Sequence, residues 1–336
     1  MDSLTHIILG ACIGEAMLGK KIGKRAMLLG AVAQSIPDID FIASSWLSTA
    51  ESLLAHRGFT HSILFVIICT PLFALLAERW HRPHNISIGK WIWFFAIGMF
   101  IHIFLDAFNT YGVGWFEPFN HYRVSFNVIY VADPFFSIVP GIAFVALLFS
   151  SSKKKGRMKW ARLGIICPAI YLISGVINKL IVDKEIKTIA AKENILYKRY
   201  FSTPAPLNIF LWYIVMENDS GYHIGYHAVY DSKGKFHSSY FPRNDGLLEP
   251  VADHEDLQHL RRFSDGYYTA ERWNDTLVFN DLRFGQEIGW ADPHAHFVFH
   301  YYLKHGADNE LVVQRGRFAR WDRNAMKLLL KRIRGD

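Results

Sequence analysis

Cysteine is scarce in this chain. Only Cys12, Cys69 and Cys167 occur among 336 residues, and each lies in an apolar segment. Three cysteines in such positions give no disulfide framework, so the redox compartment stays open. Internal repeats and low-complexity tracts are also missing. The first apolar segment lacks a basic start and contains Glu15, which argues against a signal peptide.

Charge is sparse in the first half of the chain. The whole chain is 51% hydrophobic, 15% aromatic and 20% charged, which is too apolar for an ordinary soluble protein and too polar for a pure membrane bundle. Residues 1–183 hold 16 Lys and Arg and 10 Asp and Glu, whereas residues 184–336 hold 21 and 20. We therefore predict a membrane-embedded domain over 1–183 and a soluble domain over 184–336.

Long apolar segments dominate the first half. Four of them approach the roughly 20 residues that cross about 30 Å of hydrocarbon, namely 62–80, 91–108, 134–149 and 163–181. Two weaker segments, 4–19 and 26–46, precede them and contain Glu15, Gln34, Asp38 and Asp40. These two fit short spanning helices and half-buried helices equally well.

The second half has strand and helix patterns of a different kind. Aromatic and β-branched residues predict strands at 211–217, 222–231, 276–285 and 296–304, with a turn at 232–235 and helices at 253–263 and 321–334. The predicted fold is an α-helical membrane bundle of about six apolar helices, four of them clearly spanning, followed by an α+β soluble domain.

Basic residues predict the orientation of the bundle. They gather in the connections 20–25, 79–90 and 153–162, whereas the alternate connections 47–61 and 109–132 hold only Arg57 and Arg123. Because basic connections stay in the cytoplasm, we expect a multi-pass protein of the cytoplasmic membrane whose C-terminal domain lies outside.

Polar side chains gather at the outer ends of these segments. They are His6, Asp38 and Asp40 of "PDID", His56 and His61 of "HRGFTHS", His102 and Asp106 of "HIFLD", and Asp133 of "ADP". Residues scattered over more than a hundred positions thus converge on one membrane face. A polar network that only holds helices together is the alternative interpretation.

The residue types favour a metal site. His102 and Asp106 are four apart, so a helix places both on one face. Pro37 disfavours regular helix before Asp38, and Gly58 allows a bend between His56 and His61. Four histidines and three aspartates exceed the needs of one tetrahedral ion, so we expect two divalent ions, with Zn²⁺, Mn²⁺ and Fe²⁺ all compatible.

Further polar residues have candidate supporting roles. Arg57 carries the donor fork that clamps phosphate or carboxylate, and Thr60, Asn109 and Tyr111 are placed to orient ligands or substrate. Asp133 precedes Pro134, a pattern that favours a helix cap over a metal ligand.

The motifs together resemble a known family. "LTHIILG", "PDID", "HRGFTHS", "HIFLDAFNTYG" and "VADP" occur in the order typical of the YdjM-like family of LexA-binding, inner membrane-associated, metal-dependent hydrolases, and "RRFSDGYY" and "VFNDLRFG" resemble the C-terminal region of its longer members. The resemblance implies metal ligands at His6, Asp38, Asp40, His56, His61, His102 and Asp106. We do not expect the LexA-binding role, because only short basic connections face the cytoplasm in the predicted topology.

The metal-binding pattern also resembles that of zinc-dependent phospholipase C and related zinc nucleases. Those enzymes carry another histidine about where Gly112 stands here, so the resemblance does not extend to a trinuclear site. We expect a membrane hydrolase that cleaves a phosphoester of a lipid or lipid-linked substrate by metal-activated water, with Asp38, Arg57 and Asp106 in catalytic roles and the C-terminal domain covering the site.

Two other classes of function stay open at this level. One is a catalytically silent membrane regulator with a structural metal, and the other is an ion or metal transporter. The basic C-terminal segment has few interleaved aromatic residues, so we expect no nucleic-acid partner. The oligomeric state is open.

Overall fold

The computed structural model describes residues 1–81, 83, 85–151, 156–231, 236–252, 254–303, 309 and 320–335. The predicted turn at 232–235 lies outside these residues, as do parts of two basic connections at 82, 84 and 153–155. The chain forms two compact units: Met1–Ser45 with Ala55–Ser174, and Trp46–Leu54 with Gly175–Asp336. The boundary falls inside the long helix α7 (Arg157–Lys192).

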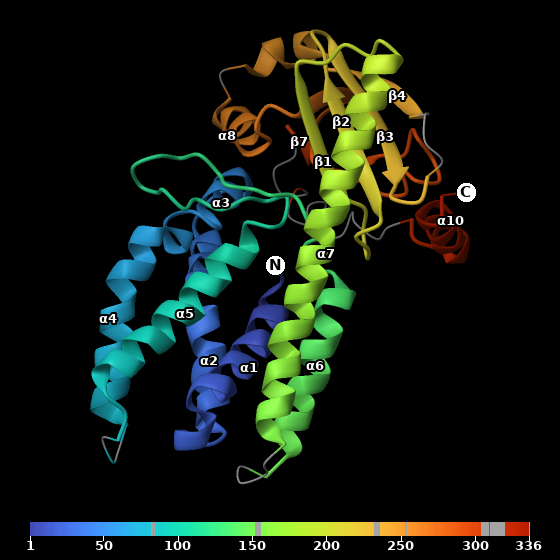
Figure 1. Cartoon of the computed structure of the whole chain (residues 1–336). Coiled ribbons are helices and arrows are strands. Elements are labelled where there is room, and N and C mark those ends of the chain that lie inside the picture. The colour runs from blue at the N-terminus through green and yellow to red at the C-terminus, as the bar shows by residue number, and fades with distance from the viewer. Residues whose placement is uncertain are drawn as a thin grey trace. The chain divides into compact units, whose positions relative to one another are not determined.

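The first unit is helical (Figure 1). Its elements are α1 (Ser3–Ile22), α2 (Arg25–Ser35), the 3-10 helices η1 (Pro37–Ser45) and η2 (Phe59–His61), α4 (Ile63–Trp80), α5 (Ile88–Asp106), α6 (Pro134–Phe149) and the first part of α7. Short connections join α1 to α2, α4 to α5 and α6 to α7 at one end of this unit. The starts of α1, α4 and α6 and the end of α5 lie at the other end.

Polar residues cap the starts of α1 and α4. Asp2 accepts a hydrogen bond from the amide of Thr5 at 3.0 Å and so caps α1. Ser62 accepts from the amide of Phe65 at 3.0 Å at the start of α4. Such caps satisfy amide groups that have no partner within the helix. Helix capping alone therefore explains the polar residues Asp2 and Ser62 at this end of the unit.

Helices α1 and α2 pack backbone against backbone. A Cβ atom on Gly14 would lie 2.0 Å from the carbonyl oxygen of Ala26, and one on Gly30 would lie 2.1 Å from that of Gly10. Only glycine fits at such an approach, which is typical of membrane helix pairs. The contact matters for the site because Gln34 lies one turn beyond Gly30, and it meets His6 of α1.

Three of the described helices are long and apolar enough to cross a membrane: α4, α5 and α7. A fourth crossing results if α2 and η1, bent by 57°, count as one broken span. The bend follows from Pro37, which disfavours helix in the residue before it. The prediction of six apolar helices is not confirmed.

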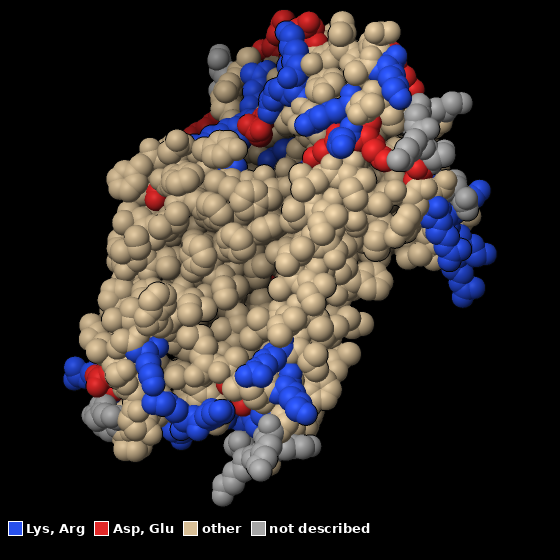
Figure 2. All heavy atoms as spheres, in the orientation of Figure 1, with Lys and Arg blue, Asp and Glu red and all other residues tan. Residues whose placement is uncertain are grey.

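Two predicted segments explain that difference. Helix α6, expected to span, has 16 residues, which at about 1.5 Å per residue is shorter than about 30 Å of hydrocarbon. Helix α1 carries Glu15, Lys20 and Lys21, and it is not among the candidate spans. Figure 2 shows a tan surface with almost no Lys, Arg, Asp or Glu over the helices of this unit, and Lys and Arg gather around the α1–α2, α4–α5 and α6–α7 connections.

The second unit contains two antiparallel sheets. The first has the order β1–β2–β3–β4, formed by Arg199–Pro204, Leu211–Glu217, Gly221–Ala228 and Ser238–Pro242. The second has the order β5–β6–β7, formed by Tyr268–Trp273, Thr276–Gln286 and Phe297–Tyr302. The described part of this unit also contains the helices α8 (Glu255–Phe263) and α10 (Arg323–Ile333), the 3-10 helix η3 (Asp245–Val251), the end of α7 and all of α3 (Thr49–Ala55) except Ala55, which belongs to the first unit. The prediction of a sheet-containing C-terminal domain is confirmed.

Strand β2 is buried along its whole length because both faces of its sheet are covered. Trp212 and Ile214 pack with Val182 and Ile186 of α7 on one face. Tyr213 lies in the other cluster, together with residues of β6 and β7. Burial on two faces explains why "LWYIVME" is continuously apolar instead of alternating. The sequence did not predict β1, β4 and β5, which are shorter or more polar.

Candidate metal centre

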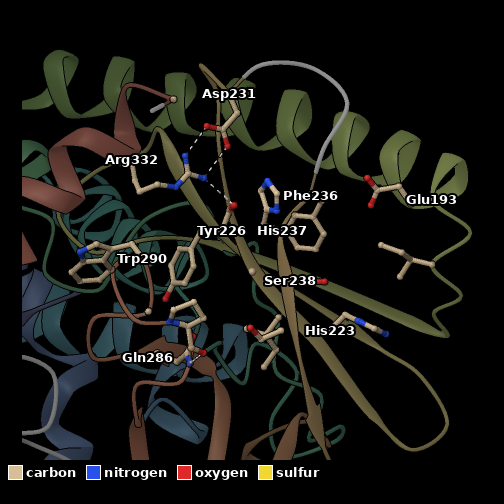
Figure 3. Close-up of a pocket in the computed structure, with 17 residues that line it drawn as sticks. Glu193, His223, Tyr226, Asp231, Phe236, His237, Ser238, Gln286, Trp290 and Arg332 are labelled. Carbon is tan, nitrogen blue, oxygen red and sulfur yellow. Dashed lines mark hydrogen bonds and ion pairs between the residues drawn. The ribbon is translucent and has the colours of Figure 1, made fainter.

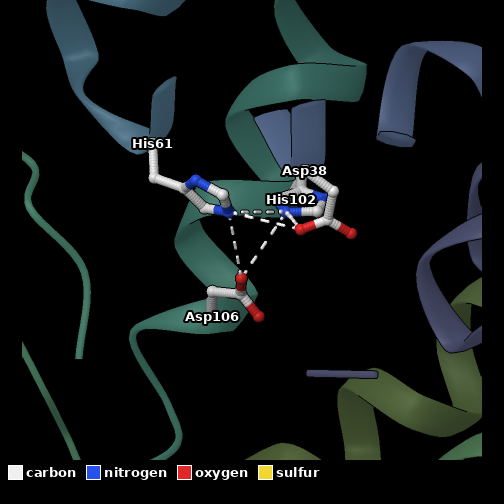
Figure 4. A group of neighbouring side chains, drawn as sticks. All are labelled: Asp38, His61, His102 and Asp106. Atoms are coloured by element: carbon white, nitrogen blue, oxygen red, sulfur yellow. Dashed lines mark hydrogen bonds and ion pairs between the residues drawn. The ribbon is translucent and has the colours of Figure 1, made fainter. Parts of the chain in front are cut away.

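Four side chains of the first unit gather at one point (Figure 4). Asp38 comes from η1, His61 from η2, and His102 and Asp106 from the last turn of α5. One donor atom from each lies within 4.8 Å of the others. His61, His102 and Asp106 are buried, whereas Asp38 keeps 18% of its side chain exposed. Each was predicted as a ligand.

The distances between these donor atoms are those of a tetrahedron around one ion. The Nε2 atoms of His61 and His102 are 3.1 Å apart. Each is 3.5 Å from Oδ2 of Asp106, and they lie 3.5 and 3.4 Å from Oδ1 of Asp38. Bonds of about 2.0–2.1 Å to a tetrahedral zinc place ligand atoms roughly 3.3 Å apart. Five of the six edges therefore have the length that such an ion needs.

Hydrogen bonds behind the two histidines fix which nitrogen faces the centre. The Nδ1 atom of His102 donates to the backbone carbonyl of Gln34 at 2.5 Å. The Nδ1 atom of His61 donates to Oδ2 of Asp40 at 3.1 Å. Since each Nδ1 carries the proton, both Nε2 atoms present lone pairs to the centre. Histidine ligands of metals have this outer partner almost always.

Asp40 lies behind His61 and outside the group of four. Its Oδ2 accepts from the backbone amide of Arg57 at 2.8 Å and from the Thr60 hydroxyl at 2.9 Å, in addition to His61. Its Oδ1 lies 3.1 Å from Nδ1 of His56. The structure thus places Asp40, predicted as a ligand, where it orients one. Thr60 has the supporting position that was predicted.

His56 lies at the edge of the site. Its ring has a T-shaped contact with His61 at 5.9 Å. Partial burial lowers the pKa of His56 below its usual 6.5, and the hydrogen bond that its ring donates to Asp40 opposes that shift. His56 is therefore a partner of Asp40 in this structure and is not one of the four grouped ligands.

His6 lies on the other side of Asp106. Its Nε2 is 3.2 Å from Oδ1 of Asp106, and its Nδ1 is 3.1 Å from Oε1 of Gln34. The ring stacks on that of His102 with centroids 3.8 Å apart. The Met1 amine also contacts Oδ1 of Asp106. The two oxygens of Asp106 thus face different neighbours, with Oδ2 toward the group of four and Oδ1 toward His6.

Arg57 is buried beside the group. Its Nε lies 3.2 Å from Oδ2 of Asp106, and its other nitrogens donate to Oδ1 of Asn109 at 2.8 Å and to the Met1 carbonyl at 2.9 Å. Its φ of 61° is in the left-handed region, which a residue with a Cβ rarely adopts. The guanidinium is therefore held against Asp106 by several partners. Its role as a clamp for a phosphate or carboxylate stays a prediction.

The remaining predicted residues divide into two kinds. Asn109 accepts from Arg57 and from the amide of Tyr111 at 2.9 Å, and the Tyr111 ring centre lies 5.2 Å from the Arg57 guanidinium carbon. Both therefore support Arg57. Asp133 instead caps α6 by accepting from the amide of Phe135 at 2.9 Å, and Tyr171 donates to its other oxygen. It lies outside the group, as the favoured helix-cap interpretation expects.

Besides Met1, sequence reasoning gave no role to two residues that contact predicted ligands. Gln34 contacts His102 through its backbone and His6 through its side chain. The hydroxyl of Ser3 donates to Oδ2 of Asp38 at 2.9 Å. A glutamine inside an apolar helix was the only signal for the first. For the second, the sequence offered none.

A hollow of about 760 Å³ lies in the second unit (Figure 3). His223, Trp290 and Arg332 are among its lining residues. Arg332 pairs with Asp231 at 2.8 and 3.0 Å and donates to the carbonyl of Tyr226, so its charge is already engaged.

Among the described residues, one group of three or more His, Cys, Asp or Glu side chains is arranged so that it could share an ion. This group is Asp38, His61, His102 and Asp106.

Comparison with known proteins decides the family. A profile of the YdjM inner membrane protein family matches residues 1–182, more than half of the chain. The chain belongs to this family. The matched region contains every residue of the candidate metal centre, so the resemblance seen in the motifs is confirmed.

Two relatives of this YdjM-family protein show how far the likeness extends. The inner membrane protein YbcI of Escherichia coli (strain K12) is 32% identical over 122 residues, which cover 36% of this chain and 69% of YbcI. The uncharacterized protein YfhP of Bacillus subtilis (strain 168) is 28% identical over 194 residues, which cover 56% of each chain. The likeness thus spans about half the length of YfhP. No solved structure matches.

Proposed function

We propose that this YdjM-family protein is an integral membrane metal-dependent hydrolase that cleaves a phosphoester, or a related bond, of a lipid or lipid-linked substrate. The observation that carries the proposal is the group of Asp38, His61, His102 and Asp106, in which five of the six distances between donor atoms, 3.1 to 3.5 Å, fit one tetrahedral ion. Membrane association supports a substrate from the bilayer.

The residues present fit a divalent cation. Two Nε2 lone pairs face each other at 3.1 Å, with carboxylate oxygens of Asp38 and Asp106 at 3.4 to 3.5 Å. Lone pairs and negative charges that face one another in a buried site repel unless a cation lies between them. Mixed imidazole and carboxylate donors suit Zn²⁺, Mn²⁺ or Fe²⁺. Zinc is our first choice because of the tetrahedral spacing.

The ion would supply a lowered water pKa and a positive charge for the developing oxyanion. Side chains of the protein would supply the other functions. His61, His102 and Asp106 are buried and would hold the ion, whereas Asp38 would be the ligand that keeps contact with solvent. Its Oδ2, which accepts a hydrogen bond from the Ser3 hydroxyl, would take a proton from water that arrives from that side. Arg57 balances the charge of Asp106 and holds it in place.

A second ion would use Oδ1 of Asp106 and would have to displace the Met1 amine that contacts this oxygen. Oδ1 of Asp106 and Nε2 of His6 are 3.2 Å apart, and Gln34 orients the His6 ring. A carboxylate shared between two ions is a recurring feature of two-metal hydrolases. In that case His6, predicted from the sequence as a metal ligand, would bind the second ion, and Asp40 and His56 would keep their supporting positions.

The site opens, in this proposal, to the extracytoplasmic side of the inner membrane. The centre lies at the end of the first unit opposite the basic connections α1–α2, α4–α5 and α6–α7. Basic connections are retained in the cytoplasm. The same rule places the C-terminal domain outside, since α7 leads away from the basic end.

Phosphodiester cleavage by purified protein tests the proposal. The protein in lipid nanodiscs, loaded with Zn²⁺, Mn²⁺ or Fe²⁺, is incubated with a chromogenic phosphodiester and with phospholipids. We expect metal-dependent turnover that falls by about 100-fold or more in Asp38→Asn. Asp275→Asn, in the exposed β5–β6 turn, is the control and should retain full activity. Protein that binds metal but turns over no phosphoester would support the silent regulator instead.

A further inference from the structure

The connection between α5 and α6 exposes an unusual number of aromatic side chains. Phe119 is 83% exposed, Tyr122 64% and Phe116 47%. Over residues 112–126, "GVGWFEPFNHYRVSF", only Glu117 and Arg123 carry charge. A contiguous exposed apolar patch on a protein surface marks a site of contact with another protein or with a membrane. We call residues 112–126 the aromatic loop.

Hydrogen bonds hold the base of the aromatic loop in place. Val113 and Val124 exchange backbone hydrogen bonds of 3.0 and 2.9 Å across it. Trp115 donates from its indole to the carbonyl of Ile103 in α5, and its own carbonyl accepts from the amide of Ile63 at the start of α4. The exposed aromatic side chains are therefore presented by a fixed base between two candidate spanning helices.

Aromatic contacts join the loop to the apolar surface of α5. Phe100 is 50% exposed and stacks on Phe104 at 5.9 Å. Phe104 stacks on Trp115 of the loop at 6.4 Å, and Trp115 contacts Phe126 at 5.9 Å. A row of aromatic rings thus runs from a helix apolar enough to span a membrane directly into the loop.

We propose that the aromatic loop lies in the boundary between lipid headgroups and acyl chains, with Phe116, Phe119 and Tyr122 in contact with bilayer lipid. Three observations select lipid over a protein partner. The loop continues the surface of α5, a helix apolar enough to span a membrane. It also lies at the end of the helices, where aromatic residues concentrate in membrane proteins. It also has almost no charge to specify a protein partner.

The loop is tied to the segment that supports the candidate metal centre. The amide of Gly114 donates to the carbonyl of Arg57 at 2.8 Å, and the guanidinium of Arg123 donates to the carbonyl of His56 at 2.7 Å. Lipid contact by the loop would therefore set the depth of the centre relative to the headgroups. This consequence rests on the proposed function, whereas the lipid contact itself does not.

Site-directed fluorescence quenching tests the proposal without reference to metal or activity. Phe119→Cys and Tyr122→Cys are made separately in a background with Cys12, Cys69 and Cys167 replaced, labelled with an environment-sensitive fluorophore and placed in nanodiscs of phosphatidylethanolamine and phosphatidylglycerol. Spin-labelled lipids quench from the headgroup region or from the acyl-chain end, and iodide quenches from water. Phe100→Cys is the acyl-chain reference, and Asp275→Cys, in an exposed turn, is the water reference.

We expect both loop labels to be quenched most by the headgroup-region spin label. Their iodide quenching constants should be several-fold lower than that at position 275. The Phe100 label should respond most to the deeper quencher. Iodide quenching of both loop labels equal to that at position 275, with no quenching by either lipid, would overturn the proposal. Phe119 and Tyr122 are largely exposed, so neither substitution removes buried packing that folding needs.

Discussion

His61 and His102 point their Nε2 atoms at each other across 3.1 Å, although one comes from a 3-10 turn and the other from the end of a 19-residue helix. Each ring is fixed on its far side because Nδ1 donates a hydrogen bond, to Asp40 from His61 and to the Gln34 carbonyl from His102. The lone pairs of two fixed Nε2 atoms at this distance repel each other, and a cation between them would turn this repulsion into favourable binding.

Replacing Asp40 by Asn should weaken metal binding without removing a ligand. The amide cannot accept the His61 proton as strongly as a carboxylate does, and it disturbs the bonds to Arg57 and Thr60. Outer partners of this kind are worth about 10–100-fold in metal affinity. Titration with Co²⁺, followed by its visible absorption, measures the affinity and reports the coordination geometry.

A matched control separates this effect from general damage. Asp275→Asn changes an exposed aspartate in the β5–β6 turn and should leave the Co²⁺ affinity unchanged. If Asp40→Asn bound Co²⁺ with wild-type affinity and spectrum, Asp40 would have no role in orienting His61.

Gly30→Ala should loosen the α1–α2 pair. The new methyl group would lie 2.1 Å from the carbonyl oxygen of Gly10, so the helices must separate. Overpacking of this kind costs about 1–3 kcal/mol. The separation would also move Gln34 away from His6 and lower metal affinity. Thermal unfolding in detergent, followed by tryptophan fluorescence, measures the first effect.

Gly141→Ala in α6 is the matched glycine control. No heavy atom other than its own helix lies within 4 Å of the added Cβ, so we expect an unchanged or slightly higher unfolding midpoint. Equal destabilisation by the two substitutions would contradict the close α1–α2 packing.

Arg157→Leu should destabilise the first unit strongly. Arg157 forms a two-point ion pair with Glu15, at 2.8 and 2.7 Å, and both side chains are buried. Removal of one partner leaves an uncompensated buried charge, which costs about 3–5 kcal/mol. The double variant Glu15→Leu with Arg157→Leu should recover much of that loss. A double variant less stable than Arg157→Leu alone would refute this explanation. Unfolding midpoints of the wild type, Arg157→Leu and the double variant in one detergent provide the test.

Asp231→Asn should destabilise the second unit in a pH-dependent way. Burial opposes ionisation of Asp231, but hydrogen bonds from Arg332 and from the Ala228 amide outweigh it and hold the pKa below its usual 3.8. A depressed folded-state pKa stabilises the fold above the unfolded pKa and loses that stabilisation as pH falls through the folded value. At pH 7 the substitution should cost about 1.5–3 kcal/mol, the range for hydrogen bonds to charged groups.

The pH series needs a surface reference. Asp219, which pairs with Lys198 where both side chains are largely exposed, is the matched residue, and Asp219→Asn should change the midpoint little at any pH. A cost of Asp231→Asn that stayed constant from pH 7 to below the folded pKa would contradict the ion-pair account.

Much of the site could be predicted from the sequence because its donors are unusual residues in apolar surroundings. His102 and Asp106 share a helix face by spacing alone, and both join the group. Asp38 and Asp40 could not be separated by the same argument. They are two apart on an irregular turn, and only the folded structure shows that one faces the group while the other supports His61.

The fold was less predictable where local and tertiary effects compete. Helix α1 carries charges that place it outside the candidate spans, yet it supplies His6 through backbone-close packing on α2. That packing depends on glycines whose role is not visible from hydropathy. Helix α6 is apolar but has only 16 residues, and the hydrophobic pattern of a sequence does not show how so short a helix fits into a bilayer.

Metal content is the measurement that tests the central claim most directly. Elemental mass spectrometry is applied to the detergent-purified protein, wild type beside His102→Ala, Asp106→Ala and the control His121→Ala, whose side chain is exposed in the aromatic loop. We predict about one to two equivalents of a transition metal in the wild type and the control, and loss of that metal from the other two variants while they stay folded. Wild-type protein that is free of metal after purification without chelator and with metal resupplied would contradict the account.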